Sequence, residues 1–594
     1  MQRTIDRIAQ LPNEQARDKS SAARRLFTYL KPEWRLLSGV LVMLCLTAIG
    51  QGGAPALIGQ AIDQFITVGD RSGLQQTIFL LFGVYIISLI GFIGQAWLMG
   101  NVSQRVLKQL RIEIFSHLQR LSLSYFDRQE AGNLMSRLVN DSEVVGNLFS
   151  QGLVRSLGSF FSLLGIVFAM FLLNWQLAIA TFLIIPAMFL TTHLFSRRAR
   201  AAFRTTRETI GDVSSNLQED ITSVREAQAF NRTAQNIERF EQANAANRDA
   251  NVRAGGVTAA FGPAIDVLST IANAMVAGVG GWLAFNSIVT VGVVVAFLAY
   301  ADRFFRPVQQ ISAFYTQMQS ALAASERIFV LLDTVPTIVD SPVAKQLPMI
   351  KGHVRFDEVS FAYDPKQLIL KDITFEAEPG DTVAIVGPTG AGKTTLVNLI
   401  ARFYNLTDGQ ILIDEHDINE VTRHSLRTQT GIVPQETFLF ASTIADNIRY
   451  NHSEATMEEI ISAAQAAHAH DFIMAMSDGY DTELGERGGN LSQGQRQLLG
   501  IARALLMKPN LLILDEATAS VDTRTERLIQ SALETLLAGR TAFVIAHRLS
   551  TIRHADKILV LDEGQIVESG THHSLLAQNG LYADLYRKQI RPVA

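Results

Sequence analysis

The chain is poor in cysteine and in charge, and each shortage excludes a class of protein. Cys45 is the only cysteine among 594 residues, which excludes a disulfide within the chain and a thiolate metal cluster. Charged residues make up only 18%, which is low for a soluble protein and indicates membrane segments. The formal net charge of −4 gives no sign of a nucleic-acid partner.

The N-terminal region also lacks the pattern of a signal peptide, because Asp6, Glu14 and Asp18 stand among its basic residues. We therefore expect the first hydrophobic span to direct insertion into the membrane. With 594 residues the chain is too long for one hydrophobic core, so at least two domains are expected.

Long stretches that are nearly free of charge fill the N-terminal half. A helix crosses the hydrocarbon core with about 20 apolar residues, and two of the four stretches are twice that long. Turns at Asn174-Trp175-Gln176 and near Phe285-Asn286-Ser287 divide them. The sequence therefore predicts six membrane spans, at residues 36–62, 74–104, 156–173, 177–196, 256–284 and 288–306.

Basic residues are concentrated before the first span and in the loops that follow the second and fourth spans. The opposite loops carry almost none, with Arg71 as the exception. Because basic loops stay inside, we expect a multi-pass cell-membrane protein whose N-terminus and C-terminal half face the cytoplasm. Both long cytoplasmic loops show helical periodicity. Their tips, Phe126-Asp127-Arg128 and Ala227–Phe230, are interpreted as contacts with the C-terminal domain; the alternative is a solvated helical hairpin.

These patterns divide the chain into a membrane domain over residues 1–330, a linker over 331–352 and a β-rich α/β domain over 353–594. Within the spans, Asp266 is an acidic residue that must face a partner or a watery cavity. It is interpreted as a cation or substrate contact; the alternatives are a place near the headgroups or a pair with Arg303. Phe297, Tyr300 and Phe304 share a helical face that either lines a cavity or packs against other helices.

A glycine-rich loop follows a buried strand, Thr382–Val386, and precedes a helix. In this context glycines let backbone N–H groups surround phosphate oxygens, and the helix N-terminus adds partial positive charge. Lys393 is expected to reach the β- and γ-phosphates, and Thr394 to bind Mg²⁺; the alternative is a glycine-rich turn without a ligand. The residues expected to hold the nucleotide here are Gly387, Pro388, Thr389, Gly390, Ala391, Gly392, Lys393, Thr394 and Thr395.

A second buried strand, Leu511–Leu514, ends in the carboxylate pair Asp515-Glu516. Asp515 is expected to hold Mg²⁺, directly or through water, and Glu516 to polarise the attacking water as general base. The alternative is that the pair only caps a helix.

Between these motifs, Leu491-Ser492-Gln493-Gly494-Gln495 resembles the signature sequence of the ATP-binding cassette (ABC) family. The resemblance extends over essentially the whole chain. It implies that Tyr363 stacks on adenine, that Gln435 contacts Mg²⁺ and the lytic water, and that His547 contacts the γ-phosphate. It further implies that Asp522 lies in a loop that crosses a dimer interface. The signature residues Ser492, Gln493, Gly494 and Gln495 would bind the ATP of a facing domain, so the chain is expected to work as a dimer.

The order of parts resembles ABC exporters of the multidrug and lipid flippase type. The implied fold is a membrane domain of six helices with long cytoplasmic extensions, followed by a P-loop ATPase domain. The implied function is ATP-driven export of an amphipathic compound by alternating access. Import of a metal chelate or cofactor, a regulatory subunit and a channel are the alternatives. Gln493 and Ala519 depart from the commonest motifs, and homodimer and heterodimer both stay open.

Overall fold

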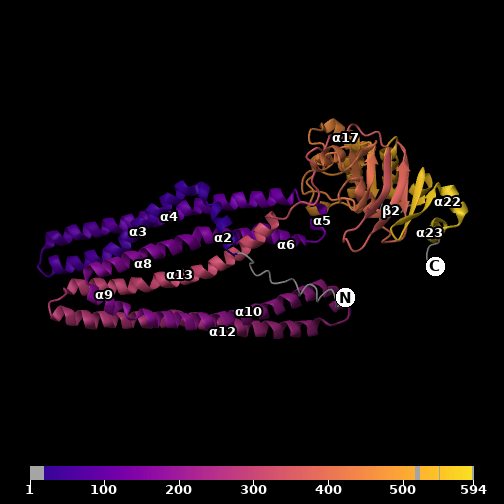
Figure 1. Ribbon diagram of the computed structural model, residues 1–594. Helices are drawn as coiled ribbons and strands as arrows, with labels where there is room; N and C mark the ends of the chain where they lie inside the picture. The colour runs from indigo at the N-terminus through magenta and orange to yellow at the C-terminus, as the bar shows by residue number, and fades with distance from the viewer. Residues whose placement is uncertain (1–18, 516–521, 547–548, 591–594) are drawn as a thin grey trace. The chain divides into compact units, whose positions relative to one another are not determined.

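The computed structural model describes residues 19–515, 522–546 and 549–590 (Figure 1). The chain divides into two units that are described separately. The first contains residues 1–118 and 132–333, and the second contains residues 119–131 and 334–594. A short segment from the N-terminal half therefore belongs to the C-terminal unit.

The first unit is entirely helical over its described residues. Its α-helices are α2 (Lys19–Thr28), α3 (Trp34–Ala61), α4 (Arg71–Leu118), α6 (Ala131–Ser136), α7 (Ser142–Asn147), α8 (Val154–Leu173), α9 (Trp175–Phe182), α10 (Ile185–Thr222), α11 (Val224–Ala229), α12 (Thr233–Phe285) and α13 (Val291–Leu332). Shorter helical segments are the 3-10 helix η1 (Lys31–Glu33) and the π-helices η2 (Ile62–Ile66), η3 (Arg137–Asp141) and η4 (Leu148–Leu153). Figure 1 shows α3, α4, α8 and α13 side by side, and α10 beside α12.

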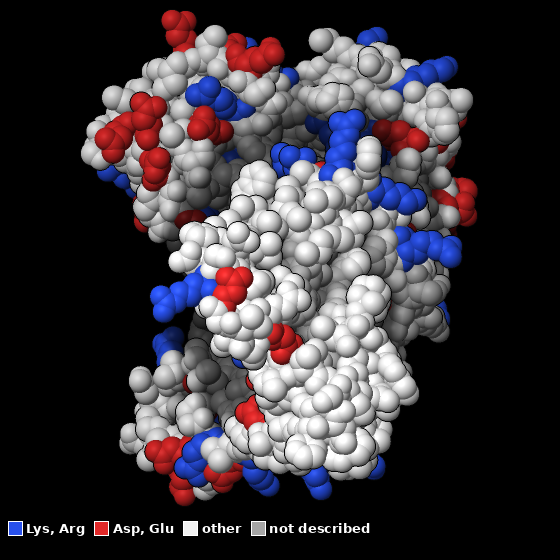
Figure 2. Space-filling model, turned by 90° about the vertical axis from the view of Figure 1, so that its left-hand side faces the viewer, with Lys and Arg blue, Asp and Glu red and all other residues white. Residues whose placement is uncertain are grey.

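Five helical segments of the described chain are long and apolar enough to cross a membrane: Lys31–Ile66, Arg71–Leu118, Ala131–Leu173, Trp175–Thr222 and Thr233–Phe285. The sixth expected span lies in α13. The end of the helices that faces the viewer in Figure 2 presents a broad uncharged surface. An uncharged surface of this kind is expected where a protein contacts lipid or lies at the boundary of the membrane.

Both expected turns are confirmed. Asn174 has extended backbone angles and its side-chain oxygen accepts a hydrogen bond of 2.9 Å from the Leu177 N–H, which starts α9. Asn286 ends α12, and Ser287 follows with a φ of 58°, a left-handed conformation that reverses the chain. A side-chain cap and a left-handed residue are ordinary helix-ending devices.

The aromatic face of α13 is packing. Phe297 and Tyr300 are 0% exposed and Phe304 is 6% exposed, so none of them lines an open cavity. Arg303 donates to the Gln51 carbonyl and the Tyr85 hydroxyl. The expected alternative of a pair between Arg303 and Asp266 is therefore wrong, and Asp266 is exposed on α12.

Two sheets build the second unit. The antiparallel sheet has the order β2-β1-β4-β5, with β1 (Val354–Phe361), β2 (Leu370–Ala377), β4 (Asp408–Ile413) and β5 (His416–Asp417). The other sheet has the order β10-β9-β3-β8-β7-β6, with β3 (Thr382–Val386), β6 (Thr430–Val433), β7 (Leu511–Asp515), β8 (Thr541–Ile545), β9 (Lys557–Asp562) and β10 (Gln565–Gly570). Only β10 among these six pairs antiparallel.

Helices cover the six-stranded sheet, and β7 shows how its strands divide the core. Leu511 and Ile513 belong to one hydrophobic cluster, whereas Leu512 and Leu514 belong to another. This alternation is what a strand buried on both faces requires. The helices of this unit are α5 (Leu123–Phe126), α14 (Lys393–Ile400), α15 (Arg423–Arg427), α16 (Ile444–Ile448), α17 (Met457–Ala466), α18 (His470–Met474), α19 (Gln493–Met507), α20 (Thr523–Leu537), α21 (Leu549–His554), α22 (His572–Gln578) and α23 (Leu581–Ile590).

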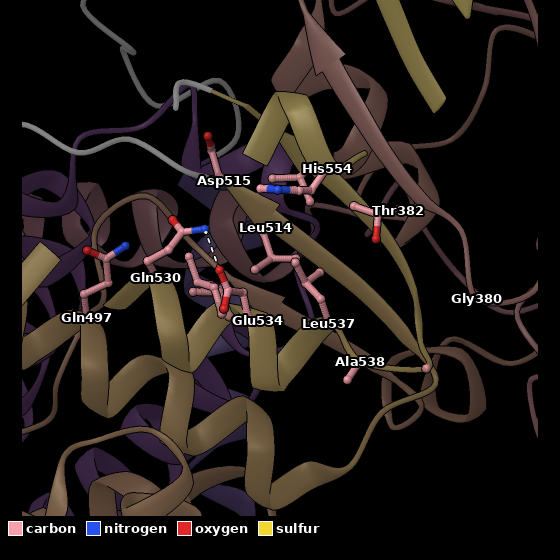
Figure 3. A pocket seen from close by; sticks show the side chains of 14 residues that line it. Gly380, Thr382, Gln497, Leu514, Asp515, Gln530, Glu534, Leu537, Ala538 and His554 are labelled. Carbon is pink, nitrogen blue, oxygen red and sulfur yellow. Dashed lines mark hydrogen bonds between the residues drawn. The ribbon is translucent and has the colours of Figure 1, made fainter. Parts of the chain in front are cut away.

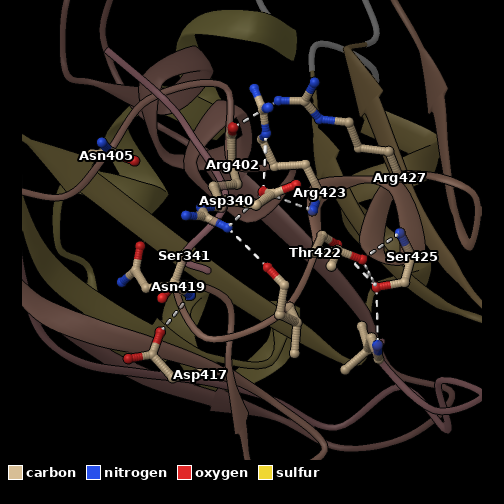
Figure 4. A network of polar contacts seen from close by, with 12 residues as sticks. Asp340, Ser341, Arg402, Asn405, Asp417, Asn419, Thr422, Arg423, Ser425 and Arg427 are labelled. Atoms are coloured by element: carbon tan, nitrogen blue, oxygen red, sulfur yellow. Dashed lines mark hydrogen bonds and ion pairs between the residues drawn. The ribbon is translucent and has the colours of Figure 1, made fainter. Parts of the chain in front are cut away.

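The Asp340 carboxylate is one of the groups that hold the linker after α13 on the second unit. Asp340 accepts hydrogen bonds from the Arg423 backbone N–H at 3.1 Å and from its side-chain Nε at 3.0 Å (Figure 4). Arg402, only 4% exposed, lies 3.5 Å from the same oxygen. Arg427 stands nearby, so three arginines surround this one carboxylate. Burial lowers the pKa of Arg427, and repulsion from Arg423 and Arg402 lowers it further.

Candidate nucleotide site

The carboxyl ends of the parallel strands bring most of the expected site residues to one edge. Gly387 follows β3, Gln435 lies two residues beyond β6, and Asp515 ends β7. The strands β3, β8, β7 and β6 run parallel in that order. In open α/β sheets this edge is where ligands bind, because loops from several strands meet there.

Glycine is required at two positions of the loop between β3 and α14. Gly387 has a φ of 156°, and a Cβ on it would lie 2.1 Å from the Leu561 carbonyl oxygen. Gly392, with a φ of 102°, starts α14 without any side-chain cap. The N–H groups of the first turn are thus left without a side-chain acceptor, as an anion-binding helix N-terminus needs.

Lys393 bends over this loop. Its Nζ donates to the carbonyls of Gly387 at 2.8 Å and Pro388 at 2.9 Å. Burial lowers the pKa of Lys393, and the Asp515 carboxylate opposes that change by attraction. The positive charge is therefore held beside the loop with few carboxylates to neutralise it, which favours phosphate oxygens as its partners.

Tyr363 lies next to the same loop. Its hydroxyl oxygen is 3.2 Å from the Thr395 Oγ1 in the first turn of α14. Its ring is 40% exposed and meets Phe361 and Tyr404 edge-on, with centroid distances of 4.8 and 5.1 Å. An exposed aromatic ring fixed beside a phosphate loop can stack on a base.

The segment around α5 contacts this aromatic cluster. Tyr404 Oη donates a hydrogen bond of 2.5 Å to Asp127, and Arg128 donates one of 3.1 Å to the Tyr363 carbonyl. A cavity of about 570 Å³ lies between this segment and Tyr363. Sequence reasoning expected a contact at Phe126-Asp127-Arg128 but missed Tyr404. Its position just after the phosphate-loop helix, next to Phe403, was the available signal.

Gln435 and the signature residue Gln493 line one cavity of about 430 Å³, together with Arg487 and Arg496. Both glutamines are exposed. Asp515 lines a different cavity, of about 570 Å³, with Gln530 and Glu534 of α20 (Figure 3). The metal ligands expected at Thr394, Gln435 and Asp515 therefore come from elements that meet at this edge of the sheet.

The signature forms a second helix N-terminus. Ser492 Oγ accepts a hydrogen bond of 3.2 Å from the Gln495 N–H, and Gln495 Oε1 accepts one of 2.9 Å from the Ser492 N–H. This reciprocal capping box begins α19. Gly494 is buried, whereas Ser492 and Gln493 are exposed. The Ser492 oxygen accepts from the backbone, so its own proton is available to an outside acceptor.

Asp522 has a structural role that sequence reasoning did not assign. Its carboxylate accepts hydrogen bonds of 3.0 Å from the N–H groups of Arg524 and Thr525, which caps α20. These bonds, those from Thr525 first, hold the pKa of Asp522 below its usual range. Glu516 and His547, the expected base and switch residue, lie outside the described residues.

Comparison with known proteins gives matches over both units. A family model described as "ABC transporter transmembrane region" matches residues 37–308, and one described as "ABC transporter" matches residues 370–519. An uncharacterized ABC transporter ATP-binding protein, YfiC of Bacillus subtilis, is 39% identical over 97% of this chain and 95% of its own length.

Two further relatives carry functional names. A fatty acid ABC transporter ATP-binding/permease protein of Mycobacterium bovis is 40% identical over 87% of this chain and 82% of its own length. An ATP-dependent lipid A-core flippase of Syntrophus aciditrophicus is 37% identical over 96% of this chain and 94% of its own length.

A solved structure of a bacterial Atm1-family ABC exporter with ATP bound superposes with a TM-score of 0.77 at 31% identity, covering 94% of this chain and 99% of that one. The chain therefore belongs to the ABC transporter family, as an integral membrane half-transporter of the exporter type whose ATPase domain couples ATP hydrolysis to transport.

Proposed function

We propose that this chain exports an amphipathic or hydrophobic compound, a drug or a lipid, across the cell membrane as a dimer of half-transporters. The observation that carries the proposal is the presence of two separate helix N-termini suited to phosphate, at Gly392 and Ser492, in one ATPase domain. The names of the relatives that move fatty acids or lipid A support a cargo with a large apolar part.

The first N-terminus binds the chain's own ATP. Lys393 and the N–H groups of α14 hold the β- and γ-phosphates, and Tyr363 stacks on adenine. Asp515, Thr394 and Gln435 would hold a magnesium ion, which neutralises phosphate charge. Glu516 polarises the attacking water and His547 contacts the γ-phosphate, as the family resemblance implies.

The second N-terminus serves the partner's ATP. One γ-phosphate can occupy only one of the two sites, so Ser492 needs a phosphate from another chain. The exposed Ser492 hydroxyl and the N–H groups at Gln493 and Gly494 supply the donors. ATP between two such domains acts as an adhesive, and its hydrolysis lets them separate. Closure and separation, passed on through the cytoplasmic loops, open the spans alternately to the two sides.

Mixed dimers test this arrangement. A Lys393→Ala chain and a Ser492→Arg chain, each with a different affinity tag, are co-expressed, and dimers carrying both tags are isolated. If the signature completes the partner's site, both defects fall in one site and the other site is intact. We expect about half of the wild-type ATPase rate from the mixed dimer and almost none from either variant alone.

If each chain completed its own site, both sites of the mixed dimer would be damaged and its ATPase rate would match the single variants. That result would overturn the proposed assembly. A homodimer predicts ATP turnover by the purified wild-type chain alone. A heterodimer, which the unusual Gln493 also allows, predicts turnover only when a partner half-transporter is present.

The direction of transport needs a separate measurement. Inverted vesicles that expose the ATPase domain to added ATP should accumulate a fluorescent amphipath in their lumen. Loss of a preloaded compound from the lumen under the same conditions would indicate import and contradict the proposal.

A further inference from the structure

The membrane unit carries a polar stripe on α12 that α13 extends with a carboxylate. Asp266, Ser269, Thr270 and Asn273 recur at helical spacing, so they lie on one face of α12. Asn273 Nδ2 donates a hydrogen bond of 2.7 Å to Asp302 of α13, and Ser269 Oγ lies 3.5 Å from the same oxygen. The stripe and Asp302 form one polar group between two helices.

This stripe differs from the face of α12 that packs against other helices and from the exposed apolar face of α12. Ile265, Ala272 and Val276 are buried against other helices. Val267 and Ile271 are exposed apolar residues. At about 100° per residue, these two sets and the stripe occupy three different sides of the helix. The stripe, with Asp266 and Thr270 exposed and Ser269 and Asn273 half-buried, is therefore a polar side next to an exposed apolar side.

The depth of these residues places the stripe within the bilayer. Asp302 lies eleven residues after the start of α13 at Val291, which corresponds to about 16 Å of helix. That is close to half of a hydrocarbon core of about 30 Å. Asn273 lies twelve residues before the end of α12 at Phe285, at a matching depth. Asp266 lies two turns further along, about 28 Å from that end, near the other boundary of the core.

The group has more acceptors than donors. Among the described residues no ion pair involves Asp302 or Asp266, and Arg303 is engaged with Gln51 and Tyr85. The Asn273 Oδ1 is buried and has no hydrogen-bond partner in the described part of the chain. The Ser269 and Asn273 donors are already directed at Asp302. What the group lacks is a positive charge and N–H or O–H donors.

We propose that Asp302, Asn273 and Asp266 bind the positively charged end of an amphipathic cation. The apolar part of this cation lies along the adjacent apolar face of α12. A carboxylate at the depth of Asp302 is tolerated only beside a partner or a water-lined path, and a cationic substrate supplies the partner. This inference rests on the proposed export function and narrows its substrate class. It separates this chain from a carrier of fatty acids, because a carboxylate cargo would meet like charge.

Tetraphenylphosphonium and tetraphenylborate test the inference, since they share a shape and differ in the sign of their charge. The purified protein in lipid nanodiscs is titrated with each ion, and the half-maximal concentration for ATPase stimulation is measured. Asp302→Asn and the double variant with Asp266→Asn should raise the half-maximal concentration of the cation at least tenfold. They should leave that of the anion unchanged or lower it. Asp302→Glu, which keeps the charge, should restore the response to the cation.

Asp249→Asn is the matched control, because it removes one carboxylate from the same helix outside the span. This control should leave the half-maximal concentration for ATPase stimulation unchanged for both ions. Equal shifts for both ions in the double variant, or no shift, would overturn this inference while leaving export intact. A wild-type protein whose ATPase responds to neither ion and which transports no amphipath would overturn the export proposal as well.

Discussion

The Asp63 carboxylate accepts a hydrogen bond of 2.7 Å from the backbone N–H of Gly292, although 229 positions separate the two residues in sequence. Asp63 lies in η2, just after α3, and Gly292 lies in the first turn of α13. The Thr290 hydroxyl donates to the same carboxylate. The Asp63 side chain thus caps the N-terminus of α13. This contact joins the first and sixth spans at one end.

Asp63→Ala should remove this cap and lower the stability of the protein. Loss of a helix cap typically costs about 1 kcal/mol, because N–H groups of the first turn lose their acceptor. We expect a lower unfolding temperature for the purified protein in detergent, followed by helical circular dichroism. Asp63→Asn keeps one acceptor oxygen and should lose less. An Ala variant as stable as wild type would contradict the capping role.

Gly292→Ala tests the close approach of the same helices. A Cβ on Gly292 would lie 2.0 Å from the Gly59 carbonyl oxygen. The helices must therefore separate, which we expect to cost about 1–3 kcal/mol. Gly281→Ala on α12 meets nothing within 4 Å and serves as the control. Similar unfolding temperatures for the two variants would show that this contact is unimportant.

Glu516→Gln should bind ATP and lose its hydrolysis. Removal of a general base typically lowers the rate by about 10²–10⁴-fold, while the phosphate contacts of Lys393 persist. Binding of a fluorescent ATP analogue and release of phosphate are measured on the same preparation. Glu526→Gln, an exposed site on α20, controls for the loss of one carboxylate. A rate near wild type would contradict the role of Glu516.

Tyr404→Phe should weaken the contact of the α5 segment with the ATPase domain. The ring contacts with Phe361 and Tyr363 persist, but Asp127 loses its hydrogen bond, at a cost of about 1.5–3 kcal/mol for a charged acceptor. We expect the ratio of substrate-stimulated to basal ATPase rate to fall at least twofold. Tyr450→Phe, where the exposed ring stacks on Phe440, is the control. An unchanged ratio would mean that the hydrogen bond between Tyr404 and Asp127 does not couple substrate binding to ATP hydrolysis.

His572 should make the ATPase domain less stable in mild acid. Burial lowers the pKa of His572 below 6.5, and His573 and Arg553 add repulsion. Between that lowered pKa and 6.5, the unfolded chain binds more protons than the folded one, so stability falls as pH drops below 6.5 and is full above it. The ring also bonds to the Tyr582 hydroxyl at 2.6 Å.

His572→Gln keeps an acceptor for Tyr582 and removes the titration. The drop in unfolding temperature between pH 7.5 and pH 5.5 should therefore be smaller in this variant than in wild type. His573→Gln should retain most of the drop. Equal drops in wild type and His572→Gln would refute the assignment.

Local patterns in the sequence predicted the elements, because each rests on neighbouring residues. The turns at Asn174 and Asn286 and the strand before Gly387 were all visible from spacing and residue type. The capping roles of Asp63 and Asp522 were not, because one depends on a contact between distant helices and the other on backbone geometry. Asp302 was overlooked beside Asp266, although it also lies within an expected span, residues 288–306. Its hydrogen bond from Asn273, which joins α13 to the polar stripe of α12, is visible only in the structure.

The strand, glycine turn and helix of the phosphate loop were predicted, since they are contiguous in sequence. The hydrogen bond from Tyr404 to Asp127 was not, because the partners lie 277 positions apart. Glu516 and His547 stay predictions from the family resemblance.

The membership of residues 119–131 in the C-terminal unit has a consequence for biogenesis. At about 5–20 residues per second, ribosomes need about 10–40 s to make the chain between this segment and the body that receives it. During that interval Asp127 has no Tyr404 to bind, because the second unit has not yet been made. An ATPase domain expressed alone would lack this segment and leave Tyr404 uncovered. The second unit therefore gains its full set of contacts only when residues 119–131, which are made much earlier, pack against it.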